Sequence, residues 1–431
     1  MADLASVSTV AEGLNLGGGS EVHALTLPKP WQDLAMASKP FPELVVVVGE
    51  EGSDPVVTHE GRDHRVDEYA LSGHLGRMDG DLRDVADLGV EVLRYGMPWR
   101  LTELEPGCYD WSLWDRALNA CEQHGLEPVV DLLHFGLPDH YAGFCDASFV
   151  GGFCRYVDAF LARYRDVSWF TPVNEPGVHA VLSARLGIWN DRRSDEASHA
   201  TALANVVLAN LEAIARIRAD RDGWWIGSEG FSCYVGADEE AQAEADLARS
   251  EDWLVWDLHL GVEPEGPGAV LAEHIDPATR ARIDALAVRD GRHVVAGHDL
   301  YPAGYRRFGS VDFVTATPLE IAAAYGTEAR RWFERYGVPA WVAETSNLGL
   351  DVSLQVPWLE ALSAEVEALN ASGTPSRGIC WYSRGDQFDW HTALAVPIGE
   401  VTEVGLFTQG REARPSAAAI AKLAERWSQR S

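Results

Sequence analysis

Residues 169–176 read Trp-Phe-Thr-Pro-Val-Asn-Glu-Pro, and the interpretation of the whole chain starts from this stretch. It begins as a short apolar run, which is typical of a buried strand. It ends in Asn174, Glu175 and Pro176, where polar residues and a proline mark the start of a loop. We therefore predict a strand over residues 169–173 that places Asn174 and Glu175 at its carboxyl end.

Seven other short apolar runs lie along the chain, separated by segments with helical patterning. Strands that alternate with helices predict repeated βα units, and eight such units close a (β/α)8 TIM barrel of the α/β class. The predicted strands are 45–48, 90–95, 128–133, 169–173, 224–228, 293–297, 340–343 and 378–382. The predicted helices are 80–88, 112–124, 149–164, 199–220, 318–336, 354–371 and 416–428.

The segments outside this alternation set the expected domain boundaries. Residues 1–43 show little periodicity and contain a run of three glycines at 17–19, so we predict an irregular N-terminal arm there. Residues 44–431 are expected to form a single barrel domain. The acidic segment 229–292, between predicted strands five and six, is expected to be a helical insertion, and a second domain there is the alternative.

Composition limits the partners of the chain. Its 431 residues are 46% hydrophobic, which is enough for a substantial core, and no run approaches the roughly 20 apolar residues that span a bilayer. The acidic balance, 35 Lys plus Arg against 66 Asp plus Glu, gives a net charge of -31. This charge opposes binding to nucleic acid or to an anionic membrane, so neither is an expected partner. No secretory signal is apparent, which predicts a cytoplasmic protein.

Candidate functional residues follow from the barrel itself, because this fold carries its sites at the carboxyl ends of the strands. The side chains at those ends are carboxylates, a cation, aromatic rings and an amide, which together suit a sugar pocket. In chain order they are Glu51, Arg94, His134, Asn174, Glu175, Glu229, Asp299, Tyr301, Glu344 and Trp381.

Glu175 and Glu344 are the candidate catalytic pair. Cleavage of a glycosidic bond needs one protonated carboxyl group to assist the leaving oxygen and one ionised group to attack or to activate water. Partial burial near another carboxylate would raise the pKa of Glu175, which suits an acid, while Arg94 and Tyr301 could keep Glu344 ionised as the nucleophile. Any single strand-end glutamate is more often a loop residue or ion-pair partner, so the prediction rests on the whole set.

Several segments resemble glycoside hydrolase family 1, the β-glucosidase family of (β/α)8 barrels with catalytic glutamates after strands four and seven. The resemblance begins at about residue 44 and runs to the C-terminus. The segments that carry it are 93–99, 126–138 (ending in His134-Phe135-Gly136-Leu137-Pro138), 169–176, 381–390 (WYSRGDQFDW), 404–406 and 414–416.

The resemblance implies a role for each matching residue. It implies that Arg94 supports the nucleophile, that Tyr301 hydrogen-bonds Glu344 and that Asn174 contacts the 2-hydroxyl of the sugar. It also implies sugar contacts by the residues His134, Asp389, Trp381 and Trp390, the two tryptophans forming an aromatic wall.

The chain departs from the family pattern at five places. One is the acid/base motif, where Thr171 is displaced and Pro172 and Val173 intervene before Asn174. Thr345-Ser346 replaces the usual Asn-Gly after the nucleophile, Asp389 replaces a glutamate, and Asp299 replaces an asparagine on strand six. Glu51 is a stand-in for the sugar-binding glutamine of the first strand. These departures affect which substrate we expect the chain to accept more than which reaction we expect it to catalyse.

The resulting expectation is a retaining exo-β-glycosidase that hydrolyses a small β-glucoside or β-galactoside by double displacement, without a cofactor or metal. The histidine spacings do not match a zinc site. Glu229 either lines the pocket or orients a neighbour. Two alternatives remain open: a transglycosidase acting on a specialised metabolite, and a non-catalytic sugar-binding barrel. The oligomeric state stays open as well.

Overall fold

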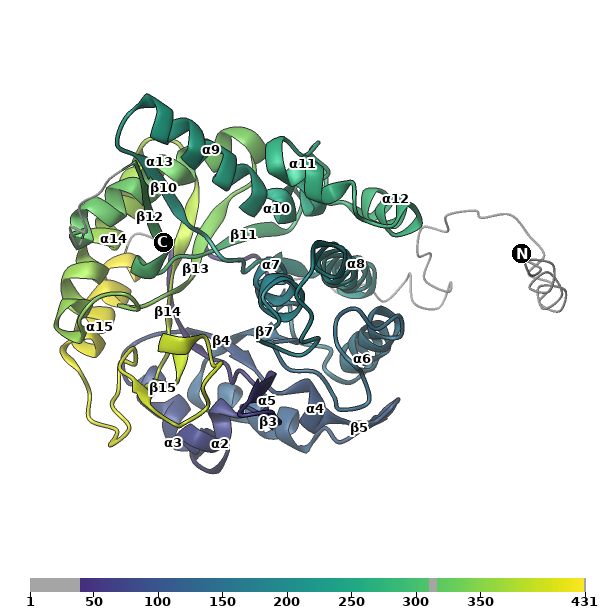
Figure 1. Cartoon of the computed structure of the whole chain (residues 1–431). Coiled ribbons are helices and arrows are strands. Elements are labelled where there is room, and N and C mark those ends of the chain that lie inside the picture. Colours follow the sequence, from purple (N-terminus) through teal and green to yellow (C-terminus); the bar gives the residue numbers. More distant parts are fainter. Residues whose placement is uncertain (1–38, 310–315, 430–431) are drawn as a thin grey trace, which may run out of the picture.

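The computed structural model of the chain describes residues 39–309 and 316–429. It confirms the predicted TIM barrel, with eight parallel strands closed into one barrel and helices around it (Figure 1). Each strand overlaps one of the eight predicted runs. The barrel strands are β1 (Val45–Glu50), β4 (Val92–Gly96), β7 (Glu127–Asp131), β8 (Trp169–Thr171), β9 (Trp224–Ile226), β11 (Val294–Asp299), β13 (Ala340–Thr345) and β14 (Ser376–Tyr382).

The barrel interior is filled by one buried side chain or more from every strand, as close packing of this fold requires. These residues are Val47, Val92, Val129, Trp169, Ile226, Val295, Trp341, Ala343 and Cys380. Phe41 joins them, with ring contacts to Trp169 at 5.1 Å and to Trp341 at 5.6 Å. Phe41 falls in the predicted arm, so barrel packing begins before residue 44. Residues 1–38 of that arm lie outside the described part of the chain.

The outer helices agree with the predicted ones within a few residues, except that α3 begins six residues earlier than expected. Local signals account for their ends: Thr317 and Glu320 form a capping box at the start of α13, and Gly337 follows its last turn in a left-handed conformation. These helices are α3 (His74–Ala86), α5 (Ser112–His124), α6 (Phe149–Arg163), α8 (Glu196–Arg221), α13 (Pro318–Tyr336), α14 (Gln355–Ala371) and α15 (Pro415–Ser428).

Helix α8 is the one helix among the described residues that is long and apolar enough to cross a membrane by length and composition. The sequence inspection underestimated its apolar character. In its most apolar window, 72% of the residues are buried, and the helix packs against α6 and neighbouring helices (Figure 1). This burial is what a core helix of a barrel shows.

The acidic segment between β9 and β11 folds as the expected helical insertion. It contributes α9 (Glu239–Asp252), α10 (Leu254–Leu260), α11 (Gly266–Ala272) and α12 (Pro277–Leu286) beside the barrel (Figure 1). Its strand β10 (Cys233–Gly236) pairs in parallel with β12 (Tyr305–Phe308), which follows β11. Apolar residues of α10 belong to the same buried cluster as the barrel helices.

Short elements follow the carboxyl ends of the strands and form the rim around the barrel mouth. Three two-stranded pairs are antiparallel: β2 with β3, β5 with β6, and β15 with β16. The rim elements are β2 (Val56–His59), β3 (Arg62–Arg65), α2 (Glu68–Ser72), α4 (Trp99–Thr102), β5 (Glu103–Glu105), β6 (Cys108–Tyr109), α7 (Pro176–Ala180), η1 (Val181–Arg185), η2 (Pro302–Gly304), η3 (Val352–Leu354), β15 (Gln387–Phe388), η4 (Trp390–Thr392) and β16 (Val401–Thr402).

The close approach of β9 and β11 makes Gly297 sensitive to substitution. A Cβ atom at Gly297 would lie 1.9 Å from the carbonyl oxygen of Gly227, a backbone atom that cannot swing aside. We expect Gly297→Ala to lower the free energy of unfolding by about 2 kcal/mol or more, measured by urea denaturation. The control is Gly76→Ala in α3, where a Cβ meets nothing within 4 Å and stability should rise by about 0.5–1 kcal/mol. Equal stability of the two variants would contradict this contact.

Candidate active site

Two glutamates from separate strands meet at the mouth of the barrel. Glu175 follows β8 and precedes α7, with a positive φ of 38°, and Glu344 lies at the end of β13. Asp299, the last residue of β11, lies beside them. One carboxylate oxygen from each of the three residues lies within 4.8 Å of the others, and all three side chains are buried. The fold thus brings together acids that are far apart in the sequence.

Donors hold both carboxylate oxygens of Glu344. Arg94 donates from Nη1 to Oε1 at 2.5 Å, and the Tyr301 hydroxyl donates to Oε2 at 2.7 Å. The two donors fix the orientation of the carboxylate and stabilise its negative charge. This geometry suits a nucleophile, as predicted from the sequence.

Arg94 itself is fully buried in β4 and contacts three other acceptors. Its Nη2 donates to Asp131 at 2.8 Å and to Oδ1 of Asn174 at 2.7 Å, and its Nη1 lies 3.1 Å from Glu51. Burial alone would lower the pKa of this guanidinium, but Glu51, Asp131 and Glu344 raise it well above its usual value. Arg94 therefore remains charged.

The surroundings of Glu175 favour a protonated carboxyl group. Burial raises its pKa well above the usual value for a glutamate, and any negative charge on Asp299, Glu344 or Glu229 raises that pKa further. Pro176 at the first position of α7 fixes the chain direction directly after it. A carboxyl group that keeps its proton in this position is suited to general acid catalysis.

Glu229 orients the segment that carries Glu175. Its carboxylate accepts hydrogen bonds from the backbone N–H of Gly177 at 2.8 Å and of Gly230 at 3.0 Å. Burial raises its pKa to about 8, although these two backbone donors lower it. Of the two roles that the sequence left open, orienting a neighbour is the one its hydrogen bonds support, and its side chain also lines the larger cavity described next.

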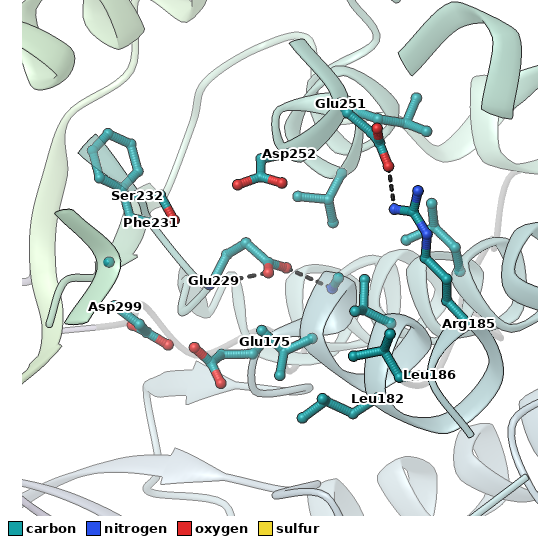
Figure 2. A pocket seen from close by; sticks show the side chains of 18 of the residues that line it. Glu175, Leu182, Arg185, Leu186, Glu229, Phe231, Ser232, Glu251, Asp252 and Asp299 are labelled. Atoms are coloured by element: carbon teal, nitrogen blue, oxygen red, sulfur yellow. Dashed lines mark hydrogen bonds and ion pairs between the residues drawn. The ribbon is translucent and has the colours of Figure 1, made fainter. Parts of the chain in front are cut away.

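Two cavities meet at Glu175, Tyr301 and Leu348. The larger one has a volume of about 520 Å³ and lies between α7, η1 and the insertion. Figure 2 shows Glu175 and Asp299 with their carboxylates turned toward one another at its edge. Glu344 lines only the smaller cavity, whose other walls include His134, Phe135, Tyr382, Gln387 and Trp390. Glu175 therefore lies at the junction and lines both cavities, whereas Glu344 lines only the smaller one.

Three further residues predicted from the sequence lie at or beside the smaller cavity. His134 lines it, and its Nδ1 lies 2.9 Å from Asp131. Trp390 also lines it, and its indole N–H is buried without a hydrogen-bond partner. Nδ2 of Asn174 is likewise buried and unpaired, because only its Oδ1 is engaged by Arg94. These two free donors are available to the oxygens of a ligand.

The prediction that Trp381 forms an aromatic wall is wrong. Its side chain is fully buried, its indole N–H donates to the carbonyl of Val404 at 3.0 Å, and it lines neither cavity. Consecutive side chains of a strand point to opposite faces, so the neighbouring Tyr382 lines the smaller cavity instead.

The prediction that Asp389 binds sugar is also wrong. Both of its carboxylate oxygens accept backbone hydrogen bonds at 2.8 Å, from Gly399 and from Glu400. The side chain is buried and lines neither cavity. Because an aspartate is one methylene shorter than a glutamate, its carboxylate stays within the rim, where it holds the loop before β16.

Glu51 and Asp299 were both predicted to bind the substrate, and neither lines the smaller cavity. Glu51 is buried against Arg94 and lines neither cavity, so it is not placed to read a sugar. Burial raises its pKa well above the usual value, although Arg94 lowers it. Asp299 lines the larger cavity rather than the smaller one, and its Oδ2 lies 2.6 Å from the Ser228 hydroxyl.

The sequence interpretation missed four residues of the site. Asp131 and Ser228 lie at or just after the carboxyl ends of β7 and β9, so the strand-end rule could have found both. Tyr382 and Gln387 belong to the quoted segment 381–390 and line the smaller cavity, but the register of that segment was needed to choose them.

Among the described residues, Glu175, Asp299 and Glu344 are also the one group of three whose ligand atoms lie close enough to share a metal ion. The expectation of no metal stays a prediction. The hydrogen bonds to Glu344 from Arg94 and Tyr301 show that protein donors already hold both of its oxygens.

Comparison with known proteins connects this site to a family. The family model described as glycosyl hydrolase family 1 matches residues 56–253. An aryl-phospho-β-D-glucosidase from Bacillus subtilis is 28% identical over 125 residues, which are 27% of this chain and 26% of that protein. β-Glucosidase 11 from Arabidopsis thaliana is 29% identical over 143 residues, which are 28% of this chain and 27% of that protein. The matched part of the chain thus spans about a quarter of the length of these curated relatives.

Solved structures extend the likeness in fold to nearly the whole chain. A family 1 β-glucosidase from Thermotoga maritima superposes with a TM-score of 0.74 at 15% identity, covering 90% of this chain and 98% of that one. A β-glucosidase from Exiguobacterium antarcticum gives a TM-score of 0.74 at 15% identity, covering 91% and 99%. Glu175 lies inside the segment that the family model matches, and the shared barrel carries the likeness on through Glu344. Residues 56–253 of the chain thus match glycosyl hydrolase family 1, and nearly the whole chain shares the fold of family 1 β-glucosidases.

Proposed function

We propose that this protein is a retaining exo-β-glycosidase that hydrolyses β-glycosides by double displacement. The observation that carries the proposal is the pair Glu175 and Glu344. One carboxyl group has a raised pKa, and the other is held by a guanidinium and a phenol. In this reaction Glu175 protonates the leaving oxygen, Glu344 attacks the anomeric carbon, and Glu175 then removes a proton from water.

The spacing of the pair supports retention of configuration. Oxygens of the two carboxylates lie within 4.8 Å of one another. Retaining enzymes hold these groups about 5–5.5 Å apart, whereas inverting enzymes need about 6.5–9.5 Å to admit a water molecule between the sugar and the base. The short separation favours direct attack by Glu344.

The two cavities support an assignment of the two halves of the substrate. The sugar would occupy the smaller cavity, where Glu344 lies, and the aglycone would occupy the larger one, with the scissile oxygen beside Glu175 at their junction. Apolar side chains supply much of the larger wall, which favours an aryl or other apolar aglycone. These side chains include Val178, Leu182, Leu186, Phe231, Leu254 and Leu348.

An unphosphorylated sugar fits the smaller cavity better than a sugar phosphate. Three of the similar proteins are named as acting on phosphorylated β-glucosides. The described residues that line the smaller cavity of this chain include neither Lys nor Arg, and a bound phosphate is normally held by such cations. We therefore infer a β-glucoside or β-galactoside with a neutral sugar. A screen of nitrophenyl glycosides with and without 6-phosphate tests this inference.

Transfer of the sugar to an alcohol remains the second candidate, since the volume of the larger cavity, about 520 Å³, would also admit an acceptor. Product analysis with added alcohols separates the two reactions. Hydrolysis as the sole outcome with every acceptor would reject the transferase. Tight sugar binding without turnover over days would instead favour the non-catalytic barrel.

Glu344→Gly should abolish hydrolysis, because the carboxylate that attacks the anomeric carbon is lost. Azide should enter the vacated space, restore part of the activity and yield an α-glycosyl azide, which NMR identifies. A β-glycosyl azide from this variant would contradict the assignment of Glu344 as the nucleophile.

Glu175→Ala should slow the cleavage of alkyl β-glycosides by about 10²–10⁴-fold, because general acid assistance is lost. Dinitrophenyl glycosides have a good leaving group and should form the glycosyl-enzyme at nearly the normal rate. Steady-state kinetics with both substrates measures the difference. If kcat/KM fell by the same factor for alkyl and for dinitrophenyl glycosides, the result would argue against an acid role for Glu175.

Tyr301→Phe removes the donor to Oε2 of Glu344 while keeping the ring. We expect kcat/KM to fall by about 10²-fold with little change in thermal stability. Tyr305→Phe in β12 is the matched control, since Tyr305 lines neither cavity. The assignment fails if the two variants have the same activity.

A further inference from the structure

We propose that Asp299 is a neutral, protonated carboxylic acid in the resting enzyme and that it acts as a positioning residue for Asn174. It would donate a hydrogen bond to Ser228, which in turn donates to Asn174. The role in positioning rests on the proposed glycosidase function, whereas the protonation state can be tested without turnover.

The orientation of the Asn174 amide is fixed by Arg94. A guanidinium has only donors, so the Asn174 atom that lies 2.7 Å from Nη2 of Arg94 is the oxygen. Nδ2 of the amide therefore points elsewhere, and it is buried without a partner. This is the atom that is free to donate to a substrate hydroxyl.

The hydroxyl of Ser228 has two close oxygen neighbours and a single proton. Its Oγ lies 2.7 Å from Oδ1 of Asn174 and 2.6 Å from Oδ2 of Asp299. Because the amide oxygen cannot donate, the contact with Asn174 is a hydrogen bond only if Ser228 donates its one proton there. The short contact with Asp299 is then a hydrogen bond only if Asp299 supplies the proton. An ionised Asp299 would leave two acceptors facing each other in a buried place, which is costly.

The groups around Asp299 agree with a neutral carboxyl. Burial and the nearby Glu344 raise its pKa well above the usual value, although Arg94 and the Ser228 hydroxyl lower it. Its Oδ1 is buried without a partner, which an ion would tolerate poorly. The charged or titratable groups that face it are Arg94 on β4, Glu175 before α7, Glu229 after β9, Tyr301 after β11, Glu344 on β13 and Cys380 on β14.

A neutral Asp299 has two consequences for the site. It completes a hydrogen-bond chain from Asp299 through Ser228 to Asn174, which keeps Nδ2 of Asn174 directed at the substrate. It also avoids a further negative charge within 4.8 Å of Glu175 and Glu344. When Asp299 ionises at high pH, Ser228 would turn its proton to the carboxylate, and Asn174 would lose one of its two donors.

Infrared difference spectroscopy of the resting protein tests the protonation state. The spectrum of the wild type minus that of Asp299→Asn, at neutral pH, should contain the carbonyl band of one protonated carboxyl group. The carboxyl groups of Glu175 and Glu229 are present in both samples and cancel. A carboxylate band in place of the acid band would overturn the proposal even if the glycosidase function holds.

Two substitutions at Asp299 test its positioning role. Asp299→Asn keeps a donor toward Ser228, whereas Asp299→Leu has similar size and no donor. We expect kcat/KM of Asp299→Leu to fall by about 10²-fold and that of Asp299→Asn to remain at least about tenfold higher than the leucine variant. Thermal melting of both variants checks that they are folded. Equal losses in the two variants would overturn the donor role.

The pH profile of kcat/KM tests whether Asp299 carries a charge beside Glu175. A neutral Asp299 adds no charge beside Glu175, so the alkaline limb of kcat/KM should lie at nearly the same pH in Asp299→Asn as in the wild type. If Asp299 were ionised, its charge would raise the pKa of Glu175, and removing it would shift that limb to lower pH by about one unit or more. Such a shift would reject the proposal.

Discussion

A buried guanidinium supports the whole mouth of the barrel. Arg94 has no exposed surface, and its acceptors come from the ends of four other strands: Glu51, Asp131, Asn174 and Glu344. An unpaired cation in this position would be very costly, so folding must gather the acceptors around it. Glu344 is therefore oriented by the same contacts that balance a buried charge. Glu344 cannot turn away without leaving Arg94 short of a partner.

One cation cannot neutralise every acid that lies near it, and the surroundings of the remaining acids favour their protonated forms. Burial and neighbouring charges raise the pKa of Glu51, Glu175 and Asp299. A glycosidase needs two carboxyl groups in different protonation states at one pH. Glu344 receives a hydrogen bond from Arg94, whereas burial and neighbouring carboxyl groups raise the pKa of Glu175. The same polypeptide environment thus separates two chemically identical side chains.

The barrel that positions the pair has the fold of solved structures at only 15% sequence identity. Loops at the carboxyl ends of barrel strands vary freely because the strands hold the catalytic groups independently. Asp389 shows the effect, since its carboxylate holds the backbone of Gly399 and Glu400 rather than lining a cavity. The insertion beside the barrel likewise supplies part of the wall of the larger cavity.

The sequence by itself determined the eight strands, their order and the glutamates after strands four and seven, because strand runs and strand-end residues are local patterns. Only the tertiary structure decided that Tyr382 rather than Trp381 lines the cavity, because a one-residue change in register reverses which face a side chain takes. It also decided that Glu51 lies against Arg94 rather than in a cavity, and that Phe41 packs on Trp169 in the barrel interior. The contacts of Asp299 with Ser228, and of Ser228 with Asn174, join residues from three strands. Such contacts depend on barrel closure, which no local pattern encodes.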